Sequence, residues 1–367
     1  MEAPTMPARV SSPGQILSME LEARGWTQSD LAAIMGRPPQ ALSEIINAKK
    51  QVTPETALEL AEALGTSAEI WLNLESNYRL HQARKNDSNR GVISRRSRLN
   101  ELAPVRELRN RGWITPADDS IDALEAAVCN FLRIDTPQET PAVAANLRSS
   151  QTYTPEQASQ VSWLMRVRQL AEQVQDVTPD IEGLAANLSE LLLLSARAED
   201  TLLVPAFLQK YGVILTVVPH LPKSYVDGAA FHLSNIPVIA LSLRYSRIDN
   251  FWFTLMHELA HLILKHDDVY YDVLYGSEGG EQRLQPQETE ANAWAADALI
   301  TPEAYEQFIR GNKFTGPAIR TFAERIGRHP GIVVGRLQND GHIRFNQHRG
   351  MLQNVPTTKL HASLRAP

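Results

Sequence analysis

The chain has 367 residues, of which 43% are hydrophobic and 21% charged; this suits two or three folded domains and excludes collagen-like and disordered classes. Its single cysteine, Cys129, excludes an intrachain disulfide framework and a cysteine-based zinc site. The formal net charge is −6, no hydrophobic run is long enough to span a membrane, and residues 1–14 lack the hydrophobic core of a secretory signal. We therefore expect a cytoplasmic protein without a membrane partner.

Residues 15–80 are predicted to form consecutive short helices, because hydrophobic residues recur at helical spacing. Thr27, with Asp30 three residues later, is a typical N-cap for a first helix, and Gly36 suits the end of that helix. A second helix over residues 38–48 begins with two prolines, which are favoured in a first helical turn.

The second of these helices has one hydrophobic and one polar face. Its polar side chains suit hydrogen bonds to base edges, and the lysines behind them suit phosphate contacts. The residues predicted to contact DNA are Gln40, Ser43, Glu44, Asn47, Lys49 and Lys50. Residues 14–80, closed by the segment 71–80, resemble the Cro/repressor-type helix-turn-helix and most of all the HigA-type antitoxin domain. The resemblance implies a double-stranded DNA operator and a homodimer. The alternative is a helical bundle kept for protein contacts.

A basic segment follows this head. Residues 79–111 hold ten Lys or Arg against three Asp or Glu, whereas residues 1–78 hold five against ten. The polar stretch over residues 86–91 has little to bury and is typical of a linker. We therefore predict a basic linker over residues 81–118, which is either a solvated hinge or a cationic arm that holds phosphates beside the head.

The remaining chain is predicted to be helical with a small α+β part, so the fold class is mainly α. The predicted strands cover residues 211–218 and 236–243, and the predicted helices cover residues 252–264, 289–299 and 319–326. The predicted domains are the head over residues 1–80, the basic linker, a helical middle region over 119–200, an α+β body over 201–350 and a tail over 351–367. We identify no chemistry in the middle region.

The body contains an HExxH motif, His257-Glu258-Leu259-Ala260-His261, inside a hydrophobic helical segment. On an α-helix His257 and His261 lie one turn apart on the same face, so that both imidazoles can hold one metal ion. Glu258 lies beside the open position of such a metal, where a carboxylate can take a proton from water.

A third protein ligand is expected from a second helix that starts near Glu288, 27 residues beyond His261. Glu288 and Asn292 share one face of that helix. Glu288 can therefore complete a His₂Glu site, and Asn292 can hydrogen-bond a ligand imidazole from behind. Glu290 should point elsewhere and is the second choice. Two alternatives stay open: hydrogen-bonded histidines in a metal-free core, and a metal site without catalysis.

The HExxH motif, the segment 288–292 and the strand over residues 237–241 resemble the ImmA/IrrE family of metallopeptidases, which are often fused to a helix-turn-helix. The segment 326–338 also resembles the tail of HigA-like members. The resemblance implies a zincin-like metallopeptidase body. It implies the metal ligands His257, His261 and Glu288 and the general base Glu258. Some members have Asp where Asn292 stands, which implies that the metal is held less tightly here. Zinc suits these ligands best, and manganese or iron are also accepted.

Peptide hydrolysis also requires a donor that stabilises the oxyanion. The candidates are His232, Tyr270, Tyr271 and His266, although His266 is expected off the ligand face and at the surface. The strand over residues 238–243 is either ordinary sheet core or the partner of an extended substrate. The loop over residues 267–287 either covers the site or simply connects two helices.

Three functions fit this sequence. The first is an antitoxin-like DNA-binding transcriptional regulator of a stress or toxin–antitoxin operon, whose zinc-dependent endopeptidase domain hydrolyses a regulatory partner protein, such as a repressor or a toxin partner. The second is a non-catalytic HigA-type antitoxin that represses its operon and neutralises a toxin by binding. The third is a peptidase whose helical head only docks a partner.

Overall fold

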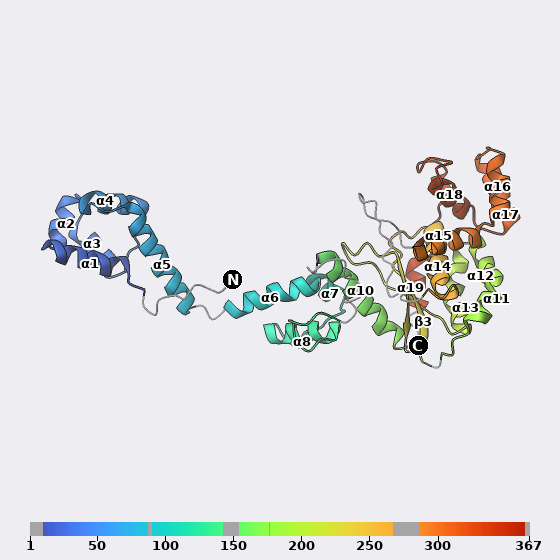
Figure 1. Cartoon of the computed structure of the whole chain (residues 1–367), viewed down its shortest axis with the longest axis horizontal. Helices are drawn as coiled ribbons and strands as arrows, with labels where there is room; N and C mark the ends of the chain where they lie inside the picture. Colours follow the sequence, from blue (N-terminus) through green and yellow to red (C-terminus); the bar gives the residue numbers. More distant parts are fainter. Residues whose placement is uncertain (1–9, 87–89, 142–153, 176, 267–285, 364–367) are drawn as a thin grey trace. The chain divides into compact units, whose positions relative to one another are not determined.

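The computed structural model describes residues 10–86, 90–141, 154–175, 177–266 and 286–363. The chain divides into two compact units, one up to Ile93 and one from Ser94 onwards (Figure 1). None of the helices in the described ranges combines the length and the hydrophobicity of a membrane-spanning segment.

The first unit is helical, as the sequence predicts. Its helices are α1 (Pro13–Arg24), α2 (Gln28–Ile34), α3 (Pro39–Ile46), α4 (Pro54–Leu64) and α5 (Ala68–Asn86). They enclose one hydrophobic core that includes Leu17, Leu31, Leu42, Leu60 and Trp71. A Cβ atom at Gly14 would lie 2.3 Å from the Ile46 carbonyl oxygen, so only glycine lets the start of α1 meet the end of α3.

The local signals around α2 and α3 are confirmed. The Thr27 hydroxyl accepts the Asp30 N–H, and the Asp30 carboxylate accepts the Thr27 N–H at 2.7 Å in return. Gly36 follows α2 with a φ of 65°, in the left-handed region that favours glycine. Pro39 occupies the first turn of α3, where its missing N–H costs no hydrogen bond.

The segment predicted as a basic linker is largely helical. It contains α6 (Arg90–Leu102) and α7 (Val105–Asn110). Leu99 and Leu108 are fully buried, and the second unit already begins within α6. The structure therefore differs from a linker over residues 81–118. Arginines and other polar residues dominate the composition of this segment. The composition therefore suggests a linker, although a few buried leucines pack the segment into the second unit.

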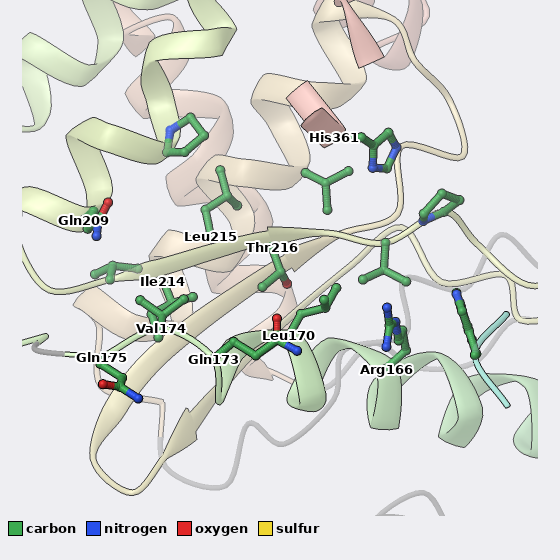
Figure 2. Close-up of a pocket in the computed structure, with 16 residues that line it drawn as sticks. Arg166, Leu170, Gln173, Val174, Gln175, Gln209, Ile214, Leu215, Thr216 and His361 are labelled. Atoms are coloured by element: carbon green, nitrogen blue, oxygen red, sulfur yellow. The ribbon is translucent and has the colours of Figure 1, made fainter. Parts of the chain in front are cut away.

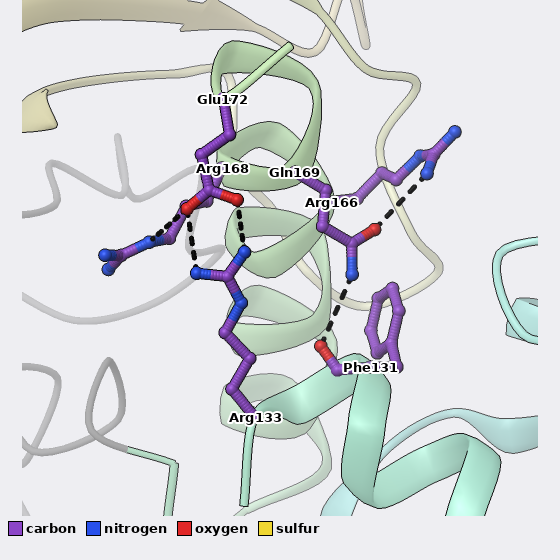
Figure 3. Close-up of polar contacts among 6 residues, drawn as sticks. All are labelled: Phe131, Arg133, Arg166, Arg168, Gln169 and Glu172. Carbon is purple, nitrogen blue, oxygen red and sulfur yellow. Dashed lines mark hydrogen bonds and ion pairs between the residues drawn. The ribbon is translucent and has the colours of Figure 1, made fainter.

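The helices of the middle region belong to the same unit as the body. Those described between residues 119 and 175 are α8 (Ile121–Leu132) and α10 (Pro155–Ala171). Just after α8, Arg133 forms an ion pair with Glu172, which follows α10 and also binds Arg168 (Figure 3). The Trp163 indole N–H on α10 donates to the Val218 carbonyl oxygen at 2.7 Å. This bond joins α10 to the end of the first strand, so the middle region is continuous with the sheet.

The sheet has three strands in the order β1-β3-β2. They are β1 (Ile214–Val217), β2 (Gly228–Leu233) and β3 (Ile236–Leu241). β1 runs parallel to β3, and β2 runs antiparallel to it through a hairpin. The turn residues Ser234 and Asn235 both have positive φ, which suits a two-residue hairpin. β1 and β3 confirm the predicted strands, whereas β2 escapes prediction because its first residues, Gly228–Ala230, are weak strand formers.

The helix α14 (Ile248–Ile263) is central to the body, and it packs against β2, β3, α15 and α18. Phe251, Trp252, Leu255 and Leu259 from this helix are buried in the main hydrophobic core. The other elements of the body are α11 (Ile181–Ala186), α12 (Leu188–Leu193), η1 (Leu194–Ala196), η2 (Glu199–Leu203), α13 (Val204–Lys210), α15 (Pro286–Leu299), α16 (Pro302–Arg310), α17 (Gly316–Ile326), α18 (Pro330–Asn339), η3 (Arg349–Met351) and α19 (Thr357–Ser363).

The segment predicted as a tail is part of this core. Val355 and Leu360 are buried in it. The Ile248 N–H donates to the Gln353 carbonyl oxygen at 2.9 Å, and the Val355 N–H donates to that of Ser246 at 2.8 Å. These bonds tie the C-terminal segment to the start of α14.

Candidate metal centre

Two histidines of α14 bring their ring nitrogens together across one helical turn. The Nε2 atoms of His257 and His261 lie 3.1 Å apart, and their side chains are 0% and 1% exposed. Almost all residues from Ile248 to Leu262 are buried, so hydrophobic neighbours surround the pair. The helix therefore holds two imidazoles with fixed directions in an interior from which bulk water is excluded.

Glu288, in the first turn of α15, completes a cluster of three residues. One of its carboxylate oxygens lies 3.4 Å from His257 Nε2, and the other lies 3.7 Å from His261 Nε2. One ligand atom from each residue can be chosen so that all lie within 4.8 Å of one another. Two imidazoles and a carboxylate form a donor set that zinc favours and that manganese and iron accept. The residues therefore fit the metal predicted from the sequence.

Glu258 is fully buried and lies against the sheet. A Cβ atom at Gly228, the first residue of β2, would lie 2.4 Å from Oε1 of Glu258 and 2.7 Å from Cγ2 of Thr254. The carboxylate therefore occupies space that any side chain at position 228 would fill. The sequence offers no signal for this contact, because the glycine and the glutamate meet only in the folded protein.

The side chains behind the cluster differ in part from the prediction. Nδ1 of His266 lies 2.9 Å from Nδ1 of His261, and Nε2 of His266 lies 3.2 Å from the Glu290 carboxylate. The sequence places His266 at the surface, but its side chain is only 6% exposed, because α14 ends at Ile263 and the chain turns back. Asn292 makes no side-chain hydrogen bond to another described residue, so its role behind a ligand stays a prediction.

The other candidates for oxyanion stabilisation are not brought to the cluster within the described residues. His232 is exposed near the far end of β2, four residues from Gly228, which corresponds to ~13 Å along a strand. Tyr270 and Tyr271 lie outside the described residues, as does the predicted loop up to residue 285.

The strand that the sequence suggests as the partner of a substrate is the central one. β3 pairs with β1 on one side and with β2 on the other, so both of its edges are occupied and no substrate can add there. Within the described part of the chain, β2 pairs with β3 alone. The outer edge of β2 therefore faces no other strand in that part of the chain, and Gly228 at the start of β2 lies against Glu258.

A separate cavity of about 360 Å³ lies along β1 (Figure 2). Its lining includes Thr216 of β1, Arg166 and Leu170 of α10 and Gln209 of α13. None of the clustered residues lines it. Its lining holds one arginine, Arg166, and one histidine, His361, among neutral side chains, so the described residues around it form no cluster of metal ligands.

In the first unit, the predicted DNA-contacting residues lie on α3 and just after it. Leu42 and Ile45 are buried on the inner face of α3. Gln40, Asn47, Lys49 and Lys50 are exposed, whereas Ser43 and Glu44 are half-buried. The Asn47 amide donates to the Ser43 carbonyl oxygen at 2.7 Å. The polar face that the sequence predicts is therefore open to solvent.

Part of the basic charge behind the head is neutralised within the second unit. Arg95 pairs with Asp122 at 2.6 Å and with Glu125 at 2.7 Å. Its hydrogen bonds to Glu125 and Asp122 raise the pKa of Arg95 above its ordinary value. Arg96 and Arg106 are exposed and have no ion-pair partner among the described residues. A cationic arm would therefore rest on fewer charges than the composition indicates.

Two family models match the chain. Residues 17–71 match the model described as "Helix-turn-helix", and residues 213–326 match the model described as "IrrE N-terminal-like domain". The first match contains α3 with its polar face. The second contains all three clustered residues, Glu258 and the strand β2.

Several known proteins are similar to about a fifth of this chain. The uncharacterized HTH-type transcriptional regulator YddM of Escherichia coli (strain K12) is 32% identical over 73 residues, which are 20% of this chain and 78% of that protein. Virulence-associated protein A of Dichelobacter nodosus is 40% identical over 70 residues, which are 18% of this chain and 69% of that protein. A solved structure of an addiction module antidote protein of a HigA family from Coxiella burnetii is 36% identical and covers 21% of this chain and 85% of that one, with a TM-score of 0.21.

Proposed function

We propose that this chain, which belongs to the helix-turn-helix transcriptional regulators and carries an IrrE N-terminal-like domain, is an antitoxin-like regulator whose second unit is a zinc-dependent endopeptidase. Its substrate is a regulatory partner protein, such as a repressor or a toxin partner, and it acts as a cytoplasmic homodimer. The observation that carries the peptidase activity is that the buried His257 and His261 and the partly buried Glu288 bring ligand atoms around one point, with the buried Glu258 next to His257 on the same helix.

The chemistry needs a divalent ion, zinc or in its place manganese, held by His257, His261 and Glu288. Such an ion supplies a Lewis acid that polarises a peptide carbonyl and makes water easier to deprotonate. Glu258 takes the proton of the attacking water and passes it to the leaving amine. Its burial supports this role, because a carboxylate shielded from bulk water meets few competing proton donors.

The substrate is proposed to lie along the outer edge of β2. The N–H and C=O groups along a strand edge can pair with an extended peptide, which fixes the register of that peptide. Gly228 brings the start of this strand against Glu258, so a peptide paired with β2 passes the general base. This proposal replaces a substrate paired with β3, whose edges are both occupied.

Metal analysis tests the centre directly. Purified wild-type protein is expected to carry close to stoichiometric zinc or manganese, whereas His261→Ala loses most of it, because the remaining imidazole and carboxylate cannot hold the ion alone. Elemental analysis of both proteins is the measurement, with His342→Ala, an exposed histidine, as the control that keeps its metal. A wild-type protein that carries no metal would contradict the proposed peptidase activity. The proposed DNA-binding regulator would be unaffected by that result.

Salt dependence tests the DNA-binding face. Lys49→Gln and Lys50→Gln are each expected to weaken binding to all duplex sequences and to reduce the slope of log K against log salt by about 1, because each removes a phosphate contact. Fluorescence anisotropy with a duplex from the promoter of its own operon measures this. The double variant Arg96→Gln, Arg106→Gln is expected to leave the slope nearly unchanged, and a large change would instead support the cationic arm.

A further inference from the structure

We infer that His266 is a positioning residue that fixes the ring orientation and the tautomer of His261, and that Glu290 fixes His266 in turn. The inference rests on the proposed function, since it concerns how one ligand of the proposed metal centre is held. It assigns a role to two residues that the sequence places away from the site.

The backbone at the end of α14 brings His266 to this place. Leu264 caps the helix, Lys265 has a φ of 53°, and the His266 N–H donates to the His261 carbonyl oxygen at 3.1 Å. This arrangement is the Schellman motif: a left-handed residue ends the helix, and the N–H of the next residue bonds to the carbonyl oxygen five residues earlier. The motif brings the side chain of that next residue over the last helical turn. That contact is usually hydrophobic. Here it joins two imidazoles, with ring centroids 5.0 Å apart.

The contacts of the two rings define where the protons sit when both histidines are neutral. The Glu290 carboxylate can only accept, so Nε2 of His266, 3.2 Å away, carries a proton. Nδ1 of His266 then accepts, and Nδ1 of His261, at 2.9 Å, donates to it. Nε2 of His261 keeps its lone pair, and it is this atom that lies near His257 and Glu288. A neutral imidazole that presents the Nε2 lone pair is the form that binds a metal ion.

Geometry and burial separate His266 from the ligands themselves. Its nitrogens face the back of the His261 ring and Glu290, whereas the cluster forms at the front of that ring. The bond to His261 is sheltered, because the His266 side chain is 6% exposed, but Glu290 is 64% exposed. Solvent screens the outer carboxylate. We therefore expect His266 to contribute more than Glu290 to the hold on the metal.

The first test compares zinc dissociation constants of the full-length proteins by competition with a chromogenic chelator. His266→Leu keeps bulk but removes the acceptor, and it is expected to weaken zinc binding by about 10–100-fold. In His266→Asn the amide oxygen replaces Nδ1 as an acceptor and is expected to restore most of the affinity. Glu290→Gln is expected to lower the zinc affinity less than His266→Leu does. Asp297→Asn, on the exposed side of the same helix as Glu290, is expected to leave the zinc affinity unchanged.

Two outcomes overturn the inference. One is a His266→Leu protein that binds zinc as tightly as the wild type. The other is equal weakening in the Leu and Asn variants together with lower melting temperatures of the metal-free proteins, which identifies His266 as a merely structural residue.

The second test needs no metal. Long-range ¹H–¹⁵N NMR spectra of histidine-labelled, metal-free protein, recorded under conditions in which both rings are neutral, are expected to show the Nδ1–H tautomer for His261 and the Nε2–H tautomer for His266. An Nε2–H tautomer of His261 overturns the inference. This result stands even if the wild-type protein binds no metal, an outcome that contradicts only the proposed function.

Discussion

Replacing Glu258 with Gln is expected to slow cleavage of the partner protein by about 10²–10⁴-fold, because the amide cannot take a proton from the attacking water. The metal content should not change, since the ligands proposed for the ion are His257, His261 and Glu288. Initial cleavage rates of the candidate partner from the same operon, measured beside the metal content of each protein, check both parts of this expectation.

Glu303→Gln is the matched control for Glu258→Gln. Glu303 is an exposed glutamate on α16, and its substitution should change neither the cleavage rate nor the metal content. Cleavage that proceeds equally well in Glu258→Gln would show that this carboxylate is not the base. Absence of cleavage in the wild-type protein, with DNA binding intact, would favour the non-catalytic antitoxin that neutralises a toxin by binding.

The substitution Gly228→Ala is expected to lower the cleavage rate by about 10²-fold, because a shift of the general base by about 1 Å is enough for such a loss. The new Cβ atom would lie 2.4 Å from Oε1 of Glu258, so the carboxylate has to move. The metal content and the DNA affinity should stay at wild-type levels. The measurements are the cleavage rate, elemental analysis and the melting temperature.

Gly350→Ala serves as the control for Gly228→Ala. No atom lies within 4 Å of a Cβ at Gly350, so the added methyl group meets nothing. A Gly228→Ala protein that cleaves at the wild-type rate would mean that the Glu258 carboxylate works from another position. Full loss of metal in that variant would instead point to a distorted α14.

The sequence predicts the parts of this protein in which local rules decide. Thr27 caps the start of α2 through its side-chain hydroxyl, and Gly36 follows the end of α2 with a left-handed φ, as predicted. The spacing of His257 and His261 on one helix follows from helical geometry alone. Bringing Glu288 to them requires α15 to pack on α14, and that packing agrees with the paired motifs.

Features that depend on contacts distant in the sequence escape prediction. β2 is a strand because it pairs with β3 and lies under α14, although Gly228–Ala230 have weak strand propensity. A continued helix would turn His266 away from His261, and only the left-handed Lys265 reverses the chain. The folded segment around α6 also escapes prediction, because the number of arginines in a sequence does not show which acidic residues form ion pairs with them. Arg95, for example, pairs with Asp122 and Glu125.

The hydrogen bonds that join residues 353–355 to the start of α14 limit how this protein can be dissected. A fragment cut to residues 213–326, the stretch that matches the IrrE-like model, lacks Gln353, whose carbonyl oxygen accepts the Ile248 N–H. It also lacks the helix α18, which packs against α14. Such a fragment is expected to expose the hydrophobic surface of α14 against which α18 packs, and to aggregate. Expression work on this body should therefore retain the C-terminal segment through α19.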